Sequence, residues 1–478
     1  QVPQDDLVLP ELTVEECLRY AGRFRAGERG SAAEIDARVE RVLTELGLDA
    51  IRRSRVGDAL RRGISGGQRK RVNLGQELMS PSTRVLFLDE PTSGLDPRAA
   101  ADIVRLARRL ADQGRIVFLV THELGPGLVA QVDQLLLLAP GGRVAWFGPP
   151  AEACAWIGVG TPEEIFDRLG DATPAEWAAR YQQTPAARTC VRLRGLHPAV
   201  EARRPSPGTL PAWAALRAVL ERYVLVKVRD HAGLLVTAAQ PLLLAAVMAL
   251  VFHRVTTPLL FMLTLSSLWL GMSGAVRELI SDRGLWLRER RIGSRVAAYL
   301  GGKVLVLAGI TAAQCLVLTT LVFGSCGLGE GGFSPAALAS ATVLTGWAGM
   351  TLGLFVSAAV SSTEAAIGLL VLLLIPQIAF SGIVMPLSEM SGPARAFSTI
   401  TLQRYALDAA LRAGDTVWYQ NRTEWQQRPT AGDLYLYGLR PSGEPPTGHA
   451  PNALALILGA FALLHLGGAA ALVARRRR

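Results

Sequence analysis

ISGGQRKRVNLGQELMSPSTRVLFLDEPTSGLD, residues 64–96, is the stretch that decides how the first part of this chain folds. Its opening SGGQ places two glycines directly before a helical pattern, so that the backbone can approach a ligand closely. The free N–H groups and the positive dipole end of a helix N-terminus suit a phosphate anion. We therefore expect a phosphate contact from Ser65, Gly66, Gly67 and Gln68.

The second half of this stretch predicts a buried strand that ends in two carboxylates. Residues 85–88 are consecutive apolar residues, and Asp89 and Glu90 follow directly. Carboxylates at the C-terminal end of a strand can serve a magnesium ion and an attacking water. Adjacent acids more often mark a solvated turn, but the apolar strand before Asp89 and Glu90 favours the functional interpretation.

Hydropathy divides the 478 residues into two parts. Residues 1–211 mix charged and apolar residues as a soluble domain does, whereas long apolar runs dominate from residue 233 onward. A helix needs about 20 apolar residues to cross a bilayer. Buried core helices of a large soluble protein are the alternative, which the near absence of charge disfavours. Six runs have about the spanning length: 233–252, 258–276, 304–323, 335–357, 365–386 and 453–474.

The net charge of +10 follows the expected membrane topology and not a nucleic-acid footprint. Basic residues concentrate at 277–303, between the second and third runs, and at 475–478. Because positive loops lie on the cytoplasmic side, we expect both there together with the soluble part, and residues 388–451 outside. No nucleic-acid partner is expected. The Ala-, Arg- and Gly-rich composition points to a GC-rich bacterium, and hence to its inner (cytoplasmic) membrane.

Local patterns predict the elements that surround these motifs. Thr13 and Glu16 have the spacing of a capping box at a helix start. Helices are expected at 31–48 and 99–113, and strands at 116–120, 135–139 and 143–147. The five cysteines form no C-x-x-C pair, so neither a metal site nor a disulfide framework is expected. The expected domains are a partial nucleotide-binding domain at 1–150, a connector at 151–211, an amphipathic connecting helix at 212–231 and a membrane domain at 232–478.

Together these motifs resemble the G subfamily of ABC half-transporters, in which an ATPase domain precedes a membrane domain on one polypeptide. The chain also resembles bacterial relatives that carry a forkhead-associated domain ahead of the same pair. The resemblance implies an α/β ABC ATPase domain of the P-loop NTPase type, partial here, followed by an all-α type-2 membrane domain of six helices. Pro97 departs from the subfamily pattern. The carrying residues are 2–6, 65–96, 121–122, 288–293, 298–299 and 303.

The resemblance assigns roles within the ATPase part. Gln4 corresponds to the Q-loop residue that touches magnesium and the attacking water. Asp89 corresponds to the residue that holds magnesium through water, and Glu90 to the general base. His122 corresponds to the switch histidine that contacts the γ-phosphate.

The same resemblance implies a dimer that binds ATP and Mg²⁺. Residues 65–68 match the signature motif, which contacts an ATP held by the opposite subunit, and Asp96 matches the D-loop residue at the same interface. No G-x-x-x-x-G-K-[ST] phosphate loop occurs in the sequence. We therefore expect an N-terminal truncation before the Q-loop and a fragment that is inactive alone.

The expected function is ATP-driven export of a lipid or a hydrophobic or amphipathic compound by a dimer of half-transporters. An ATPase-incompetent scaffold, regulator or partner-dependent subunit and a polysaccharide or peptide exporter stay open as alternatives. Few polar residues, and no acid or base that would mark an ion path, are expected within the spans. The loop 277–295 is expected to couple the two domains through ion pairs of Glu278, Asp282 and Glu289 with the ATPase domain.

Overall fold

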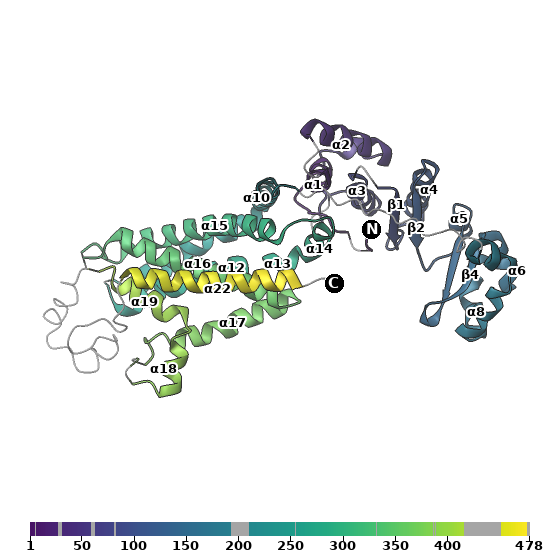
Figure 1. Cartoon of the computed structure of the whole chain (residues 1–478). Helices are drawn as coiled ribbons and strands as arrows, with labels where there is room; N and C mark the ends of the chain where they lie inside the picture. Colours follow the sequence, from purple (N-terminus) through teal and green to yellow (C-terminus); the bar gives the residue numbers. More distant parts are fainter. Residues whose placement is uncertain are drawn as a thin grey trace. The chain divides into compact units, whose positions relative to one another are not determined.

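The computed structural model falls into two compact units, Gln1–Thr209 and Leu210–Arg478. Figure 1 colours the first unit purple to blue and the second teal to yellow. The structure describes residues 1–4, 6–26, 31–58, 63–80, 83–192, 210–253, 255–330, 332–385, 387, 389–414 and 451–475.

The first unit begins with three helices whose ends follow the expected caps. The amide of Thr13 and the carboxylate of Glu16 form the expected capping box at 2.9 Å. Gly75 lets the helices approach, because a Cβ there would lie 2.8 Å from Leu46 and 2.9 Å from Leu18. The three helices are α1 (Val14–Ala26), α2 (Ala32–Leu46) and α3 (Gly66–Leu78), and a 3-10 turn, η2 (Asp49–Ile51), follows α2.

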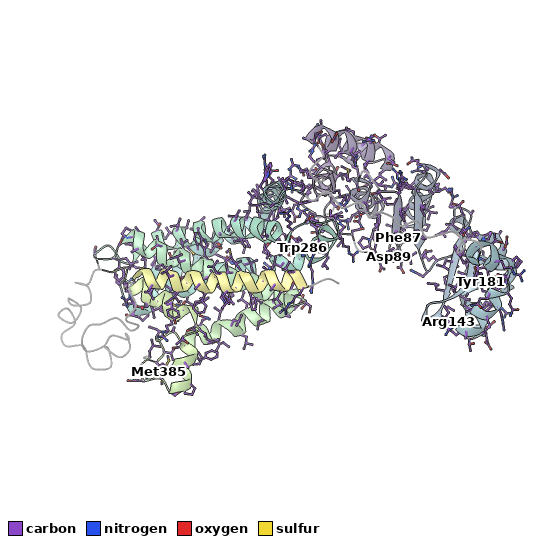
Figure 2. All side chains as sticks on the ribbon, viewed as in Figure 1. Phe87, Asp89, Arg143, Tyr181, Trp286 and Met385 are labelled. Atoms are coloured by element: carbon purple, nitrogen blue, oxygen red, sulfur yellow. The ribbon has the colours of Figure 1, made fainter. Side chains whose placement is uncertain are left out.

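A parallel strand pair carries the two carboxylates. β1 (Val85–Asp89) pairs in parallel with β2 (Ile116–Val120), and α4 (Pro97–Asp112) forms the crossover between them. The backbone of Val2 adds to β1, with its N–H donating to the Phe87 carbonyl at 2.8 Å. Figure 2 shows Phe87 and Asp89 on β1. The strands expected at 85–88 and 116–120 are confirmed.

The second half of this unit packs helices onto an antiparallel hairpin. β3 (Leu135–Ala139) pairs with β4 (Arg143–Gly148), as expected. Trp146, Trp156, Trp177 and Tyr181 pack together in tilted and edge-to-face contacts between the hairpin and the helices that follow it. The residues expected to be a connector are therefore largely helical and share this aromatic core up to Ala187. The elements are α5 (Pro126–Val129), η3 (Pro140–Gly142), α6 (Pro150–Ile157), η4 (Pro162–Glu164), α7 (Ile165–Arg168), η5 (Leu169–Asp171), α8 (Pro174–Gln182), α9 (Pro185–Ala187) and a π-helical turn, η6 (Arg188–Arg192).

The second unit is all-helical. In its described part, five helices are long and apolar enough to cross a membrane: α11 (His231–Val251), α12 (Thr257–Ala275), α15 (Val296–Ser325), α16 (Pro335–Ala359) and α22 (Pro451–Arg475).

The sixth expected span differs from the other five. The apolar run was expected to reach residue 386, but α17 (Thr363–Ala379) has only 17 residues. Gly382, at φ 94°, lies in a turn beyond its end, and Pro376 lacks the N–H that continues a helical ladder. The shorter elements of the unit are α10 (Ala212–Arg229), α13 (Glu278–Ser281), α14 (Arg283–Arg291), α18 (Gly392–Ser398) and α19 (Leu402–Leu411).

Small residues hold the centre of the helical unit together. The most apolar windows of α12 and α16 are 72% and 67% buried, against 17% for α11 and α22, so α12 and α16 form the centre. A Cβ on Gly271 would lie 2.0 Å from the Gly346 carbonyl oxygen, and one on Gly349 would lie 2.4 Å from that of Leu268. Glycines at these positions let the two backbones touch, which is typical of membrane helix packing.

Candidate functional site in the ATPase domain

Glu90 is the centre of a cluster drawn from three separate segments. Its Oε2 accepts a hydrogen bond from Nε2 of Gln4 at 3.1 Å, and its Oε1 lies 3.1 Å from Nδ1 of His122. The strand order causes this meeting, because β1 and β2 are parallel and their C-terminal ends lie at one edge. The structure therefore brings together Gln4, Glu90 and His122, the three residues expected to be catalytic.

The Glu90 backbone is held in an unusual conformation. Its φ of 44° makes it the one non-glycine residue with positive φ in the described part of the chain. Its N–H donates to the Val120 carbonyl at 2.9 Å, and its carbonyl accepts from the Ser93 N–H at 3.2 Å. Non-glycine residues in this region cost energy and concentrate at functional sites. The strand pair thus fixes the direction in which the Glu90 carboxylate points.

Asp89 and Gln4 offer the oxygen donors that magnesium prefers. Asp89 ends β1 and is half-buried, and its N–H donates to the Val2 carbonyl at 3.0 Å. Gln4 donates to Glu90 through its amide nitrogen, so its side-chain oxygen is available as a ligand. Magnesium in phosphate-handling enzymes usually takes one or two protein ligands and completes its shell with water and phosphate. The donor set at this edge fits that pattern.

Lys70 is a positioning residue that the sequence interpretation missed. It lies on α3 and is 8% exposed. Its ammonium group donates to the Gln4 carbonyl oxygen and lies 3.4 Å from Oδ1 of Asp6. α3 therefore holds the backbone that carries Gln4. In the sequence Lys70 stands in the basic run Arg69–Arg71, which gives no sign that one member is buried.

The expected phosphate-contact residues form the N-terminus of α3. Oγ of Ser65 accepts from the Gln68 N–H at 3.3 Å, and the Ser65 N–H donates to the Gln68 side chain at 2.9 Å. In the described part of the chain no hydrogen bond joins these residues to Glu90 or His122. The motif thus stands apart from the Glu90 cluster and presents a capped helix end.

The glycines and Asp96 place this helix end beside the start of α4. A Cβ on Gly66 would lie 3.2 Å from Leu95, and one on Gly67 would lie 3.2 Å from Ala99. Asp96 accepts from the Ala99 N–H at 2.9 Å and caps α4, with Pro97 at the first helical position. Asp96, the expected D-loop residue, therefore acts as the N-cap of α4 within a single chain.

Residues 1–93 match the family model described as ABC transporter, and residues 214–413 match the one described as ABC-2 type transporter. The chain is 31% identical over 464 residues to the ABC transporter ATP-binding/permease protein Rv1747 of Mycobacterium tuberculosis, an alignment that covers 89% of this chain and 51% of that protein. The chain belongs to the ABC transporters.

Other relatives of this ABC transporter chain match about a third of its length. ABC transporter G family member 28 of Arabidopsis thaliana is 44% identical over 174 residues, 36% of this chain and 15% of that protein. The broad substrate specificity ATP-binding cassette transporter ABCG2 of Bos taurus is 39% identical over 157 residues, 33% of this chain and 24% of that protein. The chain spans about half the length of Rv1747 and less of the other two. The expected order, an ABC ATPase domain followed by an ABC-2 membrane domain, is confirmed.

The loop expected to couple the two domains is locked within the membrane unit of this ABC transporter chain. Glu289 on α14 pairs with Arg222 on α10 through both carboxylate oxygens, one of them 3.1 Å from Nη2. Arg222 is 7% and Glu289 4% exposed. Burial alone lowers the pKa of Arg222, but the Glu289 charge and hydrogen bonds outweigh it and hold that pKa above its ordinary value. Arg222 therefore stays charged.

Glu278 and Asp282 complete this charged network. Glu278 accepts from Tyr223 and Lys227 on α10, each at 2.5 Å, and Lys303 on α15 lies 2.6 Å from Asp282. Burial and the Glu278 charge raise the pKa of Tyr223 well above its ordinary value, so the phenol remains a donor. We expected these acids to form ion pairs with the ATPase domain; the ion pairs that the structure shows for them are with α10 and α15, the helices that flank the loop.

One titratable residue within the apolar spans was overlooked. His465 lies in α22, and its Nδ1 is 3.5 Å from Oγ1 of Thr351 on α16. Its ring lies between Phe355 and Phe461, with centroid distances of 6.3 Å to each. We expected no acid or base that marks an ion path in the spans, and did not consider this histidine in α22. The sequence shows His465 as an isolated polar residue in LLHLGG, but it does not show that His465 meets Thr351.

Proposed function

We propose that this chain is part of an ATP-driven membrane transporter that works as a dimer of half-transporters and exports a lipid or a hydrophobic or amphipathic compound. The observation that carries the proposal is the Glu90 carboxylate, aimed by Gln4 and His122, on the same polypeptide as a set of membrane-spanning helices. A carboxylate held in this way can act in ATP hydrolysis. The membrane helices on the same polypeptide are the part that hydrolysis would move.

In this mechanism the side chains orient a water molecule for attack on the terminal phosphorus of ATP. Glu90 accepts a proton from that water while the water oxygen bonds to the γ-phosphorus. The bond between the γ-phosphorus and the β–γ bridging oxygen breaks, and ADP and phosphate are left. Gln4 and His122 keep the two carboxylate oxygens in place. Magnesium, when bound through Asp89 and Gln4, neutralises charge on the phosphates.

A second half-transporter is the proposed partner. Residues 65–68 form the N-terminus of α3, where the cap uses the N–H groups of Ser65 and Gln68 and leaves those of Gly66 and Gly67 for a phosphate held by another subunit. Closure of two ATPase domains around ATP would then move the charged loop and α10 together, because Arg222 and Glu289 join them. The proposed location is the bacterial cytoplasmic membrane, with the ATPase domain on the cytoplasmic side.

The apolar lining of the spans supports a hydrophobic or amphipathic cargo. Several polar side chains of this unit bond across helices: the Gln403 side chain donates to Thr264 at 2.7 Å, and the Gln403 backbone N–H donates to Gln377 at 2.9 Å. Gln314 donates to the Thr237 carbonyl at 2.7 Å. Such pairs serve helix packing, so they leave apolar surface as the main contact for a cargo and for membrane lipid.

The test is Glu90→Gln in the full-length protein. Removal of the general base should lower ATP hydrolysis by about 100-fold or more, while binding of a fluorescent ATP analogue is retained. Glu123→Gln, which neutralises an exposed carboxylate next to His122, is the matched control and should hydrolyse ATP normally. Full activity of the Glu90 variant would remove Glu90 from the mechanism. Failure of the unmodified full-length protein to hydrolyse ATP would favour an ATPase-incompetent scaffold or partner-dependent subunit.

A further inference from the structure

A cavity of about 100 Å³ lies where α16, α19 and α22 meet. Small side chains leave this space: Ser340 and Ala341 line it from α16 and Ala409 from α19, while Leu458 closes it from α22. The described lining carries one charged side chain, that of Arg412, which directly follows α19. An apolar cavity with one cationic group in its wall suits a ligand that has an anionic group attached to an apolar part.

Arg412 is held in place but not saturated. Its Nε donates to Oδ1 of Asp408 at 2.9 Å, and the Asp408 side chain is 1% exposed. Nη2 of Arg412 has no hydrogen-bond partner among the described residues. The guanidinium group offers five N–H donors in a planar fork that matches carboxylate and phosphate oxygens. The pair thus fixes one side of the fork and leaves donors for a ligand.

The surroundings of the cavity favour an amphiphile over a free ion. Apart from Ser340 and Arg412, the described lining is apolar, with Leu344, Leu454 and Leu458 as its largest members. The cavity lies near the first turns of α16, which the expected topology places at the outer side of the membrane. An apolar chain that enters the cavity would therefore contact this lining while its head stays near the membrane surface.

We propose that this cavity binds the head of an acidic amphiphile, a phosphate or carboxylate attached to an acyl chain, with Arg412 as the oxyanion contact. The alternative is that Arg412 only anchors the end of α19 and the space is a packing defect. The two differ in whether an acidic lipid is retained. This site does not depend on the proposed transport, because binding is measured without nucleotide.

The test uses the full-length protein in nanodiscs of phosphatidylcholine with a minor fraction of phosphatidylglycerol, followed by native mass spectrometry of the lipid that stays bound. The protein should retain phosphatidylglycerol over phosphatidylcholine. Arg412→Gln should lower this preference about tenfold, since it removes a charge-assisted contact. Arg395→Gln, which removes a positive charge from α18 outside the cavity, is the matched control and should bind normally.

Two further variants serve the case in which Arg412→Gln, by breaking the ion pair with Asp408, unfolds the unit. Ser340→Leu fills the cavity from an exposed position and keeps the ion pair; it should also abolish the preference. Asp408→Asn with Arg412→Gln removes both charges and should do the same. Retention of phosphatidylglycerol by both Ser340→Leu and the double variant would overturn the site. Displacement of the lipid by millimolar inorganic phosphate would overturn the amphiphile, because a free oxyanion would then suffice.

Discussion

Replacement of Glu289 by Gln tests whether the loop is locked to α10 by a buried ion pair. The substitution preserves the size of the side chain but removes the charge that faces Arg222. With both partners under 10% exposed, the guanidinium group would keep its charge in a desolvated site without its bidentate partner. The result would be a weaker attachment of α14 to α10.

The magnitude follows from the environment of Arg222. Loss of one partner from a buried pair costs about 3–5 kcal/mol, because the remaining charge stays out of water. Asp282 also favours the charged form of Arg222, so we expect the lower end, about 3 kcal/mol. Replacement of both partners by apolar residues, Arg222→Met with Glu289→Leu, should recover most of this loss, since no buried charge remains.

The measurement is the free energy of unfolding in mixed micelles with SDS, followed by tryptophan fluorescence. Trp286 reports on this loop because it stacks on Tyr299 with ring centroids 4.3 Å apart. Glu221→Gln is the matched control: it breaks an ion pair with Arg217 on the same helix, α10, whose side chain is 71% exposed, and should change stability little. A Glu289→Gln effect as small as that of the control would refute the buried lock.

Two further substitutions test helix packing and helix capping. Gly271→Ala should destabilise the membrane unit by roughly 1–3 kcal/mol in the same unfolding assay, because the new Cβ would meet the Gly346 carbonyl; Gly274→Ala, with open space around it, should not. Ser65→Ala should lower the free energy of unfolding of the ATPase domain by about 1 kcal/mol in a urea titration, since it removes the acceptor of the Gln68 N–H; an unchanged midpoint would show that the cap is not formed.

Local sequence patterns predicted the elements and the main cluster well. The capping box at Thr13 depends on neighbours three residues apart, and the strands depend on short apolar runs. The meeting of Gln4, Glu90 and His122 could be anticipated from the resemblance, because the motif order is that of the family. The cap and the strands depend only on neighbouring residues, and the cluster depends only on the fold of the family.

Contacts between residues far apart in the sequence could not be predicted, because they depend on tertiary packing and not on local patterns. Lys70 meets the Gln4 carbonyl across 66 positions, and Arg222 meets Glu289 across 67. Lys70 lies in a run of basic residues, and Arg222 lies in a helix whose basic residues alternate with apolar ones. In both segments only tertiary packing selects the basic residue that is buried. The length of α17 was also predicted wrongly, because the apolar run continues past Ala379 although the helix ends there.

Lipid translocation in proteoliposomes is the direct measurement of whether Glu90-dependent hydrolysis drives export. The full-length protein is reconstituted with a fluorescent phospholipid, and transfer of this lipid between leaflets is followed by dithionite quenching with and without MgATP. We expect ATP-dependent translocation by the unmodified protein and none by Glu90→Gln. Equal, ATP-dependent translocation by both proteins would show that hydrolysis through Glu90 does not drive export.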